Sequence, residues 1–229
     1  MNYLITGANR GIGLEFVKQL TSRGDTVFAT CRTPAQAEEL NALANEYQDL
    51  VTVLELDVAD SKSVDNLLAA LKQNDTKLDV LINNAGIYPQ GGTLGELDYD
   101  AFIKGFEVNS IAPLRLAEAI LPLLTGAKKV VNVTSQMGSI ADNTSGGSYA
   151  YRMSKAALNM GFKSFAIDTQ PKGVTSLVLH PGWVQTDMGG PNALITTEQS
   201  VEGMLKTIDE ATLAQSGNFY GWKGNTIGW

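Results

Sequence analysis

A tyrosine and a lysine four positions apart are the residues of this chain whose types and spacing most directly suggest chemistry. They are Tyr151 and Lys155, in the sequence YRMSK within a helical pattern. Residues at i and i+4 share one face of a helix, so the hydroxyl and the ammonium can point into one site. A free tyrosine titrates at about pH 10, and a nearby cation lowers that pKa. The pair predicts a general acid/base, and the alternative is a solvated helix face.

A glycine-rich turn is the second chemical feature. Gly7, Gly11 and Gly13 follow the apolar run Tyr3–Thr6 and open a helical pattern. Glycines let a backbone turn tightly and approach a pyrophosphate, and the helix N-terminus presents free N–H groups to its charge. The turn predicts a dinucleotide site, although its spacing is Gly-x3-Gly-x-Gly and not Gly-x-Gly-x2-Gly. The alternative is a tight turn without a ligand.

Two arginines indicate which dinucleotide is bound. No acid that could bind a ribose diol ends the second apolar run, which is followed by Arg32, and Arg10 lies in the glycine turn. Guanidinium groups form charge-assisted, often bidentate hydrogen bonds with phosphate. The pattern therefore favours NADP(H), with its 2′-phosphate, and leaves NAD(H) as the second choice. For each arginine alone, the alternative is a solvated surface charge.

Short apolar runs alternate with longer helical patterns along the chain. The runs lack strict polar alternation, as in strands that are covered on both faces. The expected strands are Tyr3–Thr6, Thr26–Thr30, Val51–Leu56, Val80–Asn83, Lys129–Val133 and Thr175–Leu179. The expected helices are Gly11–Ser22, Ala35–Glu46, Ser61–Lys72, Tyr99–Leu124, Tyr149–Thr169 and Thr197–Ala214. Pro113 should kink or restart the fourth helix.

This alternation predicts the α/β class and a single domain over residues 1–229. The expected architecture is a Rossmann-like, doubly wound parallel β-sheet flanked by helices on both faces. In such a sheet, ligands bind beyond the carboxyl ends of the strands. Functional residues should therefore follow the strands directly.

Composition excludes several classes of function. The chain has 17 Lys+Arg against 24 Asp+Glu, a net charge of −7 that disfavours nucleic acid and anionic lipid as partners. Cys31 and His180 are its single cysteine and histidine, so neither an internal disulfide nor a cysteine or multi-histidine metal cage is expected. No apolar run approaches the roughly 20 residues of a membrane span, and no signal peptide is visible. We expect a soluble, cytoplasmic enzyme-sized domain.

These motifs, taken together, resemble the short-chain dehydrogenase/reductase family. The cofactor turn of that family reads Thr-Gly-x3-Gly-x-Gly, as in residues 6–13, and Asn-Asn-Ala-Gly at residues 83–86 and the Tyr-x3-Lys pair follow in the same order. The stretches GIGLEF, GSI, YAYRMSK and TDMGG and the ending Phe219–Trp229 are similar to the C-factor and sniffer-type carbonyl reductases. The resemblance covers nearly the whole chain.

The resemblance implies a catalytic set. Tyr151 would be the general acid/base, Lys155 would lower its pKa and bind the nicotinamide ribose, and Ser135 would orient the carbonyl, with Ser139 as the rival serine. Asn109 would be the fourth member, holding a water that links Lys155 to solvent. The alternative for Asn109 is a side chain that fills the gap at a proline kink.

The resemblance also implies the cofactor contacts. Asp57 would lie beside the adenine, with helix capping as the alternative. Asn84 would either contact the cofactor or tie its loop to a neighbouring strand end, and Thr186 would bind the nicotinamide carboxamide. The expected cofactor-binding residues are Gly7, Asn9, Arg10, Gly11, Ile12, Gly13, Arg32, Asp57, Val58, Asn84, Ala85, Gly86, Tyr151, Lys155, Pro181, Gly182, Val184 and Thr186.

The function implied is NADPH-dependent reduction of a ketone or aldehyde to an alcohol. Tyr88–Leu97, Asp142–Ser148 and Met188–Leu194 would recognise this small-molecule substrate. The alternative is a catalytically quiet NADP(H)-binding regulatory or signalling protein of the C-factor type. By analogy with the family, the helices Tyr99–Leu124 and Tyr149–Thr169 would pack across a two-fold axis in a homodimer, with a tetramer left open.

Overall fold

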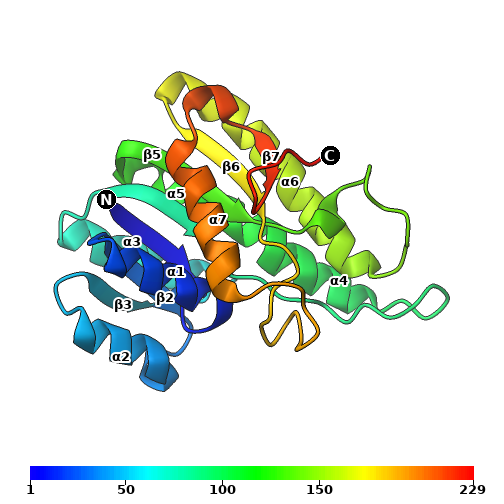
Figure 1. Cartoon of the computed structure of the whole chain (residues 1–229), viewed down its shortest axis with the longest axis horizontal. Helices are drawn as coiled ribbons and strands as arrows, with labels where there is room; N and C mark the ends of the chain where they lie inside the picture. The colour runs from blue at the N-terminus through cyan, green and yellow to red at the C-terminus, as the bar shows by residue number, and fades with distance from the viewer.

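Seven parallel strands run through the centre of the computed structural model, which describes all of residues 1–229 (Figure 1). They lie in the order β3-β2-β1-β4-β5-β6-β7, so the winding direction reverses between β1 and β4. The strands are β1 Asn2–Thr6, β2 Thr26–Cys31, β3 Val51–Glu55, β4 Leu78–Asn83, β5 Leu124–Val133, β6 Thr175–His180 and β7 Asn218–Gly221. A reversal of this kind opens a crevice at the carboxyl ends of the two strands, where ligands bind.

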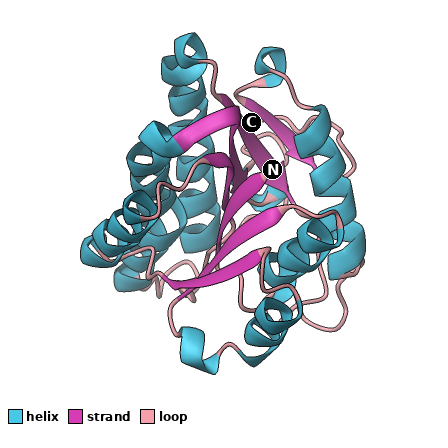
Figure 2. Cartoon of the chain, turned by 90° about the vertical axis from the view of Figure 1, so that its left-hand side faces the viewer, coloured by secondary structure: helices cyan, strands magenta, loops and turns pink.

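Helices cover both faces of the sheet, as Figure 2 shows. They are α1 Gly11–Ser22, α2 Glu38–Glu46, α3 Ser61–Gln73, α4 Tyr99–Phe106, α5 Ala112–Ile120, α6 Tyr149–Thr169 and α7 Thr197–Glu210. One hydrophobic core packs α1, α2 and α7 on the first face, and a second packs α3, α5 and α6 on the other. The doubly wound α/β fold is therefore confirmed. None of the helices is both long enough and apolar enough to span a membrane.

The region predicted as one helix over Tyr99–Leu124 is divided. It consists of α4, the π-helical turn η2 Glu107–Ile111, α5, and the short 3-10 turn η3 Leu121–Leu123. The predicted restart at Pro113 is confirmed, because α5 begins at Ala112 with the proline in its first turn, where no N–H is needed. A π-turn has no sequence signal in the apolar pattern, so only the structure shows it.

Other elements also differ from the prediction. The strand β7 was not predicted, because four residues between glycine-containing turns carry too short a pattern, and β7 is defined by its pairing with β6. The helix expected over Ala35–Glu46 begins with a 3-10 turn, η1 Pro34–Gln36, and becomes α-helical only at Glu38. The helix expected to reach Ala214 ends at Glu210.

The helix α6 carries the Tyr-x3-Lys pair. The buried face of this helix packs on the sheet. Phe162 is fully buried on this face and packs in the same core as Leu158 and Phe165. A large aromatic side chain in such a position removes apolar surface from water. A smaller side chain at the same position would leave a cavity in the core.

We expect Phe162→Ala to lower the free energy of unfolding by about 3–5 kcal/mol, because it removes buried apolar surface and leaves a cavity. Urea denaturation measures this change. The matched control is Ser164→Ala on the exposed side of the same helix, which should change the value by less than about 0.5 kcal/mol. Equal effects of the two substitutions would contradict the packing role of Phe162.

Candidate active site

The glycine turn between β1 and α1 has the geometry that its sequence predicts. Gly7 and Gly11 have positive φ values of 65° and 54°, which favour glycine. A Cβ at Gly13 would overlap the Gly7 carbonyl oxygen, and a Cβ at Gly7 would lie 3.0 Å from Cα of Ala85. The turn therefore needs glycine for its backbone conformation and for its close packing.

The N-terminus of α1 is free to accept an anion. Its N-cap residue, Arg10, makes no side-chain capping hydrogen bond, and the first turn contains no acid. The helices α3, α4 and α7 differ, since the side chains of Asp60, Asp98 and Thr196 cap them. Uncapped N–H groups and the positive end of the helix dipole fit a pyrophosphate. The turn and helix thus fit the phosphates of a dinucleotide.

The end of β4 is bound directly to this turn. Nδ2 of Asn84 donates to the carbonyl oxygens of Thr6 at 2.9 Å and of Gly7 at 3.1 Å. The backbone N–H groups of Asn84 and Ala85 both donate to Oγ1 of Thr6, at 3.0 and 2.9 Å. Of the two alternatives for Asn84, the structure shows the tie between strand ends.

The two arginines expected at the adenosine end have different environments. Nη1 of Arg10 forms an exposed ion pair, 2.8 Å long, with Oδ2 of Asp187. Arg32 follows β2 with an exposed side chain that makes no hydrogen bond or ion pair within the chain. Arg32 is therefore the freer of the two to bind an external phosphate.

Asp57, after β3, is half-buried and holds its own turn. Oδ1 of Asp57 accepts the N–H of Ala59 at 3.0 Å, and the Asp57 N–H donates to Oγ of Ser63 at 2.9 Å. Helix capping belongs to Asp60, three residues later. The neighbouring Val58 packs against the second core. Asp57 is thus fixed beside the strand end and keeps its second carboxylate oxygen unbonded within the chain.

The loop after β6 approaches the glycine turn from the other side. A Cβ at Gly11 would lie 3.3 Å from Cγ2 of Thr186. The loop itself is held by the Pro181 carbonyl, which accepts from Oγ of Ser200 at 2.6 Å, and by buried Val184. Gly182 has a φ of 90°, in the region that favours glycine. The structure thus places this loop beside the glycine turn. Within the turn itself, Asn9 is exposed, and Ile12, at the start of α1, packs on the first core.

The structure brings the expected catalytic residues together around the first turns of α6. Tyr151, Lys155 and Ser135 are each at most 9% exposed. Nζ of Lys155 lies 5.9 Å from the ring centroid of Tyr151 and donates to the Val133 carbonyl at 3.1 Å. A Cβ at Gly86 would lie 3.5 Å from this Nζ. The ends of β4 and β5 and the start of α6 therefore enclose one site.

Burial shifts the pKa values of the Tyr-x3-Lys pair. It raises the pKa of Tyr151 to about 12, against the opposing effect of hydrogen bonding with Ser135. It lowers the pKa of Lys155 to about 8, because a desolvated ammonium is destabilised. The expectation that Lys155 lowers the pKa of Tyr151 is therefore not met in this structure. The lysine is itself buried and hydrogen-bonds to a backbone carbonyl, so desolvation dominates both groups.

Asn109 lies in the π-turn and is fully buried. Its Nδ2 donates to the Ile87 carbonyl and to Oγ of Ser154, both at 2.9 Å, and its Oδ1 accepts the Ile87 N–H at 2.8 Å. Both amide N–H groups are therefore used within the chain. By these contacts, the Asn109 side chain positions the loop after β4 against α6. Its Oδ1 would lie 3.3 Å from a Cβ at Gly86, so Asn109 also borders the space that this glycine leaves open.

The rival serine has another role in the fold. Oγ of Ser139 donates to the Gly228 carbonyl at 2.6 Å and accepts the N–H of Asp142. Oγ of Ser135 accepts the Met137 N–H at 3.1 Å and also faces the Tyr151 hydroxyl, with which it can hydrogen-bond. The geometry therefore favours Ser135 as the hydroxyl that meets a ligand.

Sequence reasoning missed two contacts in this region. Ser154 joins Asn109 to α6, and its position three residues after Tyr151, on the same helix face, is the signal that could have identified it. Tyr88 was expected only as part of a substrate loop, but its ring packs on Tyr151 with centroids 4.6 Å apart. No local pattern predicts this contact, because the two residues are distant in sequence.

His180, the single histidine, lies away from the Tyr-x3-Lys pair in sequence and ends the buried strand β6. Burial lowers the pKa of His180 to about 4, so the imidazole is neutral at pH 7. No group of three or more His, Cys, Asp or Glu side chains is placed to hold a metal ion.

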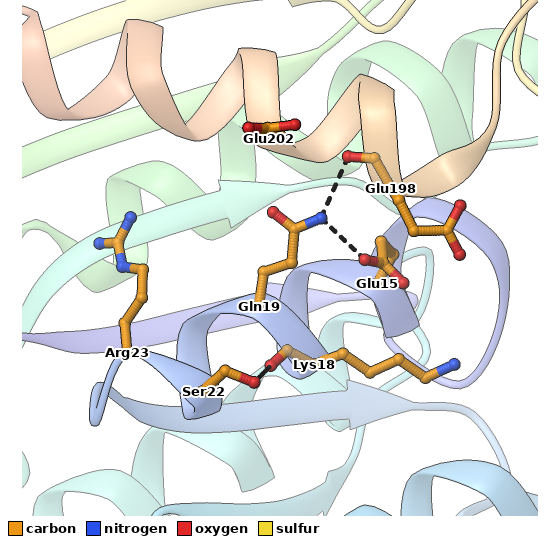
Figure 3. A pocket seen from close by; sticks show the side chains of 7 residues that line it. All are labelled: Glu15, Lys18, Gln19, Ser22, Arg23, Glu198 and Glu202. Atoms are coloured by element: carbon orange, nitrogen blue, oxygen red, sulfur yellow. Dashed lines mark hydrogen bonds between the residues drawn. The ribbon is translucent and has the colours of Figure 1, made fainter.

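A shallow groove between α1 and α7 is a separate feature (Figure 3). Nε2 of Gln19 bridges the helices, since it donates to Oε1 of Glu15 at 2.7 Å and to the Glu198 carbonyl at 3.1 Å. No hydrophobic residue and none of the predicted site residues lines this groove. It reflects polar packing between two helices and not the candidate active site.

Comparison with known proteins finds relatives in both sequence and structure. The family model described as short chain dehydrogenase matches residues 2–194. C-signal of Myxococcus xanthus is 50% identical over 154 residues, which cover 66% of this chain and 93% of that protein. Carbonyl reductase Sniffer of D. melanogaster has a similar structure, with a TM-score of 0.94 and 36% identity over 100% of this chain and 99% of that one. The NADPH-bound carbonyl reductase from chicken fatty liver gives a TM-score of 0.93 and 36% identity, over 100% and 98%.

We expect Lys155→Met to stabilise the protein at pH 7, by up to about 3 kcal/mol, because it removes a buried charge. The folded-state pKa of about 8 lies below the ordinary 10.5. Burial of the charged form therefore opposes folding below pH 8, and this penalty disappears as pH rises towards 10.5. Urea denaturation at several pH values should show the gain shrinking over that interval.

The control for this series is Lys206→Met on α7, where the side chain is exposed. It should change the free energy of unfolding little at either end of the pH range. A Lys155→Met gain that stays constant with pH would contradict a buried, titrating ammonium.

Proposed function

The chain belongs to the short-chain dehydrogenase/reductase family, as an oxidoreductase of the C-factor and sniffer type, and from this premise we propose that it reduces ketones or aldehydes to alcohols with NADPH. One observation carries the proposal. Ser135, Tyr151 and Lys155 are enclosed at the carboxyl edge of the sheet, beside an uncapped helix N-terminus. The two structural relatives described above are carbonyl reductases, one of them bound to NADPH, and they support this reading.

The residues around the sheet edge fit the cofactor. The N-terminus of α1 would hold the pyrophosphate, and Arg32, assisted by Arg10, would bind the 2′-phosphate. Asp57 and Val58 would border the adenine. The nicotinamide half would lie against the remaining predicted contacts, which are Asn84, Ala85, Gly86, Pro181, Gly182, Val184 and Thr186. When bound, NADPH supplies the hydride that reduces the carbonyl carbon.

Tyr151 is suited to act as the acid in this reduction. Its pKa of about 12 keeps the hydroxyl protonated at pH 7, so it can donate to the oxygen that gains negative charge. The Ser135 hydroxyl would donate to the same oxygen and stabilise that charge. Lys155, whose pKa is about 8, would supply the proton that restores the Tyr151 hydroxyl after the reduction and would then take up a proton from solvent.

A second candidate function is a regulatory or signalling role that depends on NADP(H) binding without turnover. The identity to C-signal over most of that protein's length is the observation in its favour. Such a role would not require Tyr151, Lys155 and Ser135 to be enclosed together, and this arrangement favours the enzyme.

We also propose a homodimer through the exposed faces of α5 and α6 and the π-turn before α5. Ile111, Leu114, Met160 and Ile167 are 38–67% exposed there, and apolar side chains of this size usually find a partner when they gather on one face. The tetramer and the cytoplasmic location stay predictions.

Tyr151→Phe tests the proposed activity. We expect NADPH oxidation with a panel of ketones, aldehydes and quinones, and a loss of about 10²–10⁴-fold in the variant, because phenylalanine cannot donate the proton. Tyr149→Phe, on the same helix turn, should keep its activity.

Three results would each contradict a different part of this proposal. Unchanged turnover in Tyr151→Phe would remove the tyrosine from the chemistry. Tight NADPH binding without reduction of any carbonyl would favour the regulatory role. No binding of either nucleotide would contradict the assignment of the glycine turn.

Arg32→Ala tests cofactor selection. We expect the KM for NADPH to rise about 10- to 100-fold and the KM for NADH to change little, because the variant loses charge-assisted hydrogen bonds to the 2′-phosphate. Arg10→Ala should have a smaller effect, since Asp187 already engages that guanidinium. The exposed Lys172→Ala is the control for general loss of charge. Equal effects of Arg32→Ala on both cofactors would contradict the 2′-phosphate role.

A further inference from the structure

The ring of Tyr88 is the closest aromatic neighbour of Tyr151. The two ring centroids are 4.6 Å apart and the planes are tilted by 35°. Tyr151 is 8% exposed, whereas Tyr88 is 38% exposed and sits on the segment that follows β4. Tyr88 therefore contributes to the burial of Tyr151 while it remains in contact with solvent.

The hydroxyl of Tyr88 is also fixed. It lies 2.6 Å from Oγ of Ser148, and either group can donate in this hydrogen bond. Ser148 is the N-cap residue of α6 and has a φ of 47° and a ψ of 39°, the left-handed conformation that side chains other than glycine seldom adopt. Backbone strain of this kind persists only where surrounding contacts hold it. The hydrogen bond to Tyr88 is one such contact, three residues before Tyr151.

The backbone on either side of Tyr88 is held as well. Ile87 exchanges two hydrogen bonds with the buried Asn109 amide. A Cβ at Gly105 would lie 2.9 Å from Cγ of Pro89, which shows how closely the next residue packs on α4. Tyr88 is thus anchored through both neighbours, and its side chain has little freedom to leave Tyr151.

From these contacts we infer that Tyr88 is a positioning residue for Tyr151. We also infer that its hydrogen bond to Ser148, called the clasp below, holds the loop after β4 against the start of α6. This inference rests on the proposed function for its catalytic meaning. The ring limits the orientation of the Tyr151 phenol, and the clasp keeps water away from it. Ring contact and clasp act together, since the hydroxyl of Tyr88 holds the ring in place.

The clasp has a consequence for proton affinity. Burial is the largest cause of the raised pKa of Tyr151, and the nearby Tyr88 adds to it. The titratable groups that face Tyr151 are Tyr88, from the loop after β4, and Lys155, from α6 itself. Removal of the Tyr88 ring would admit water and lower the pKa of Tyr151.

Tyrosinate absorbance tests this without any need for turnover. The titration of Tyr151 is isolated as the difference between the protein and its Tyr151→Phe variant, and the same difference is taken in a Tyr88→Leu background. We expect the Tyr151 transition to move to lower pH by about one unit or more in that background. The exposed Tyr99→Leu is the control and should leave it in place. An unmoved transition in Tyr88→Leu would overturn the positioning role.

Kinetics test the clasp itself. Tyr88→Phe keeps the ring and loses the hydroxyl, while Ser148→Gly loses the partner hydroxyl and suits the left-handed backbone. We expect each to lower kcat by about two- to tenfold with less change in KM, and the double variant to lose no more than either single one. Unchanged kcat or fully additive losses would overturn the clasp. A wild-type protein that turns over no carbonyl would instead contradict the proposed function, and the absorbance experiment would still decide whether Tyr88 positions Tyr151.

Discussion

The burial of the Lys155 ammonium without a carboxylate is the constraint around which this site is built. Its hydrogen bond to the Val133 carbonyl compensates only part of the lost hydration, so the pKa falls to about 8. Space for the side chain depends on glycines. A Cβ at Gly138 would lie 2.9 Å from Cβ of Lys155, and Gly86 leaves room beside Nζ. The burial of Lys155 opposes folding, but it also gives the site an ammonium group that can exchange a proton near neutral pH.

The topology explains why distant residues share this site. The winding direction of the sheet reverses between β1 and β4. The chain segments that follow β1, β4, β5 and β6 all emerge at the same edge, where the strands have their carboxyl ends. Thr6 and Asn84 join the first two segments by hydrogen bonds, and the loop after β6 packs on Gly11 through Thr186. Asn109, from the π-turn, connects the loop after β4 to α6. The side chains that would do chemistry are thus held by polar ties between loops as well as by the two cores.

The pKa of Tyr151 shows how far residue types alone can be interpreted. A lysine four positions away suggests a lowered value, because an adjacent cation favours the phenolate. In the folded chain the same lysine is desolvated and bonded elsewhere, so burial dominates and the pKa rises. The sequence shows which groups are near each other on a helix, but their exposure depends on what covers that helix.

The sequence by itself determined the alternation of strands and helices, the parallel sheet, the glycine turn and the Tyr-x3-Lys pair. These features follow from local rules, namely hydrophobic periodicity, the backbone freedom of glycine and the spacing of side chains on a helix. Only the tertiary structure decided the pairing of β7 with β6, the π-turn at Asn109, the tie through Asn84, and the contact of Tyr88 with Ser148 and Tyr151. Each of these joins segments far apart in the chain or changes a helix without changing its apolar pattern. Their geometry is fixed by packing and desolvation in three dimensions, and no local sequence rule contains it.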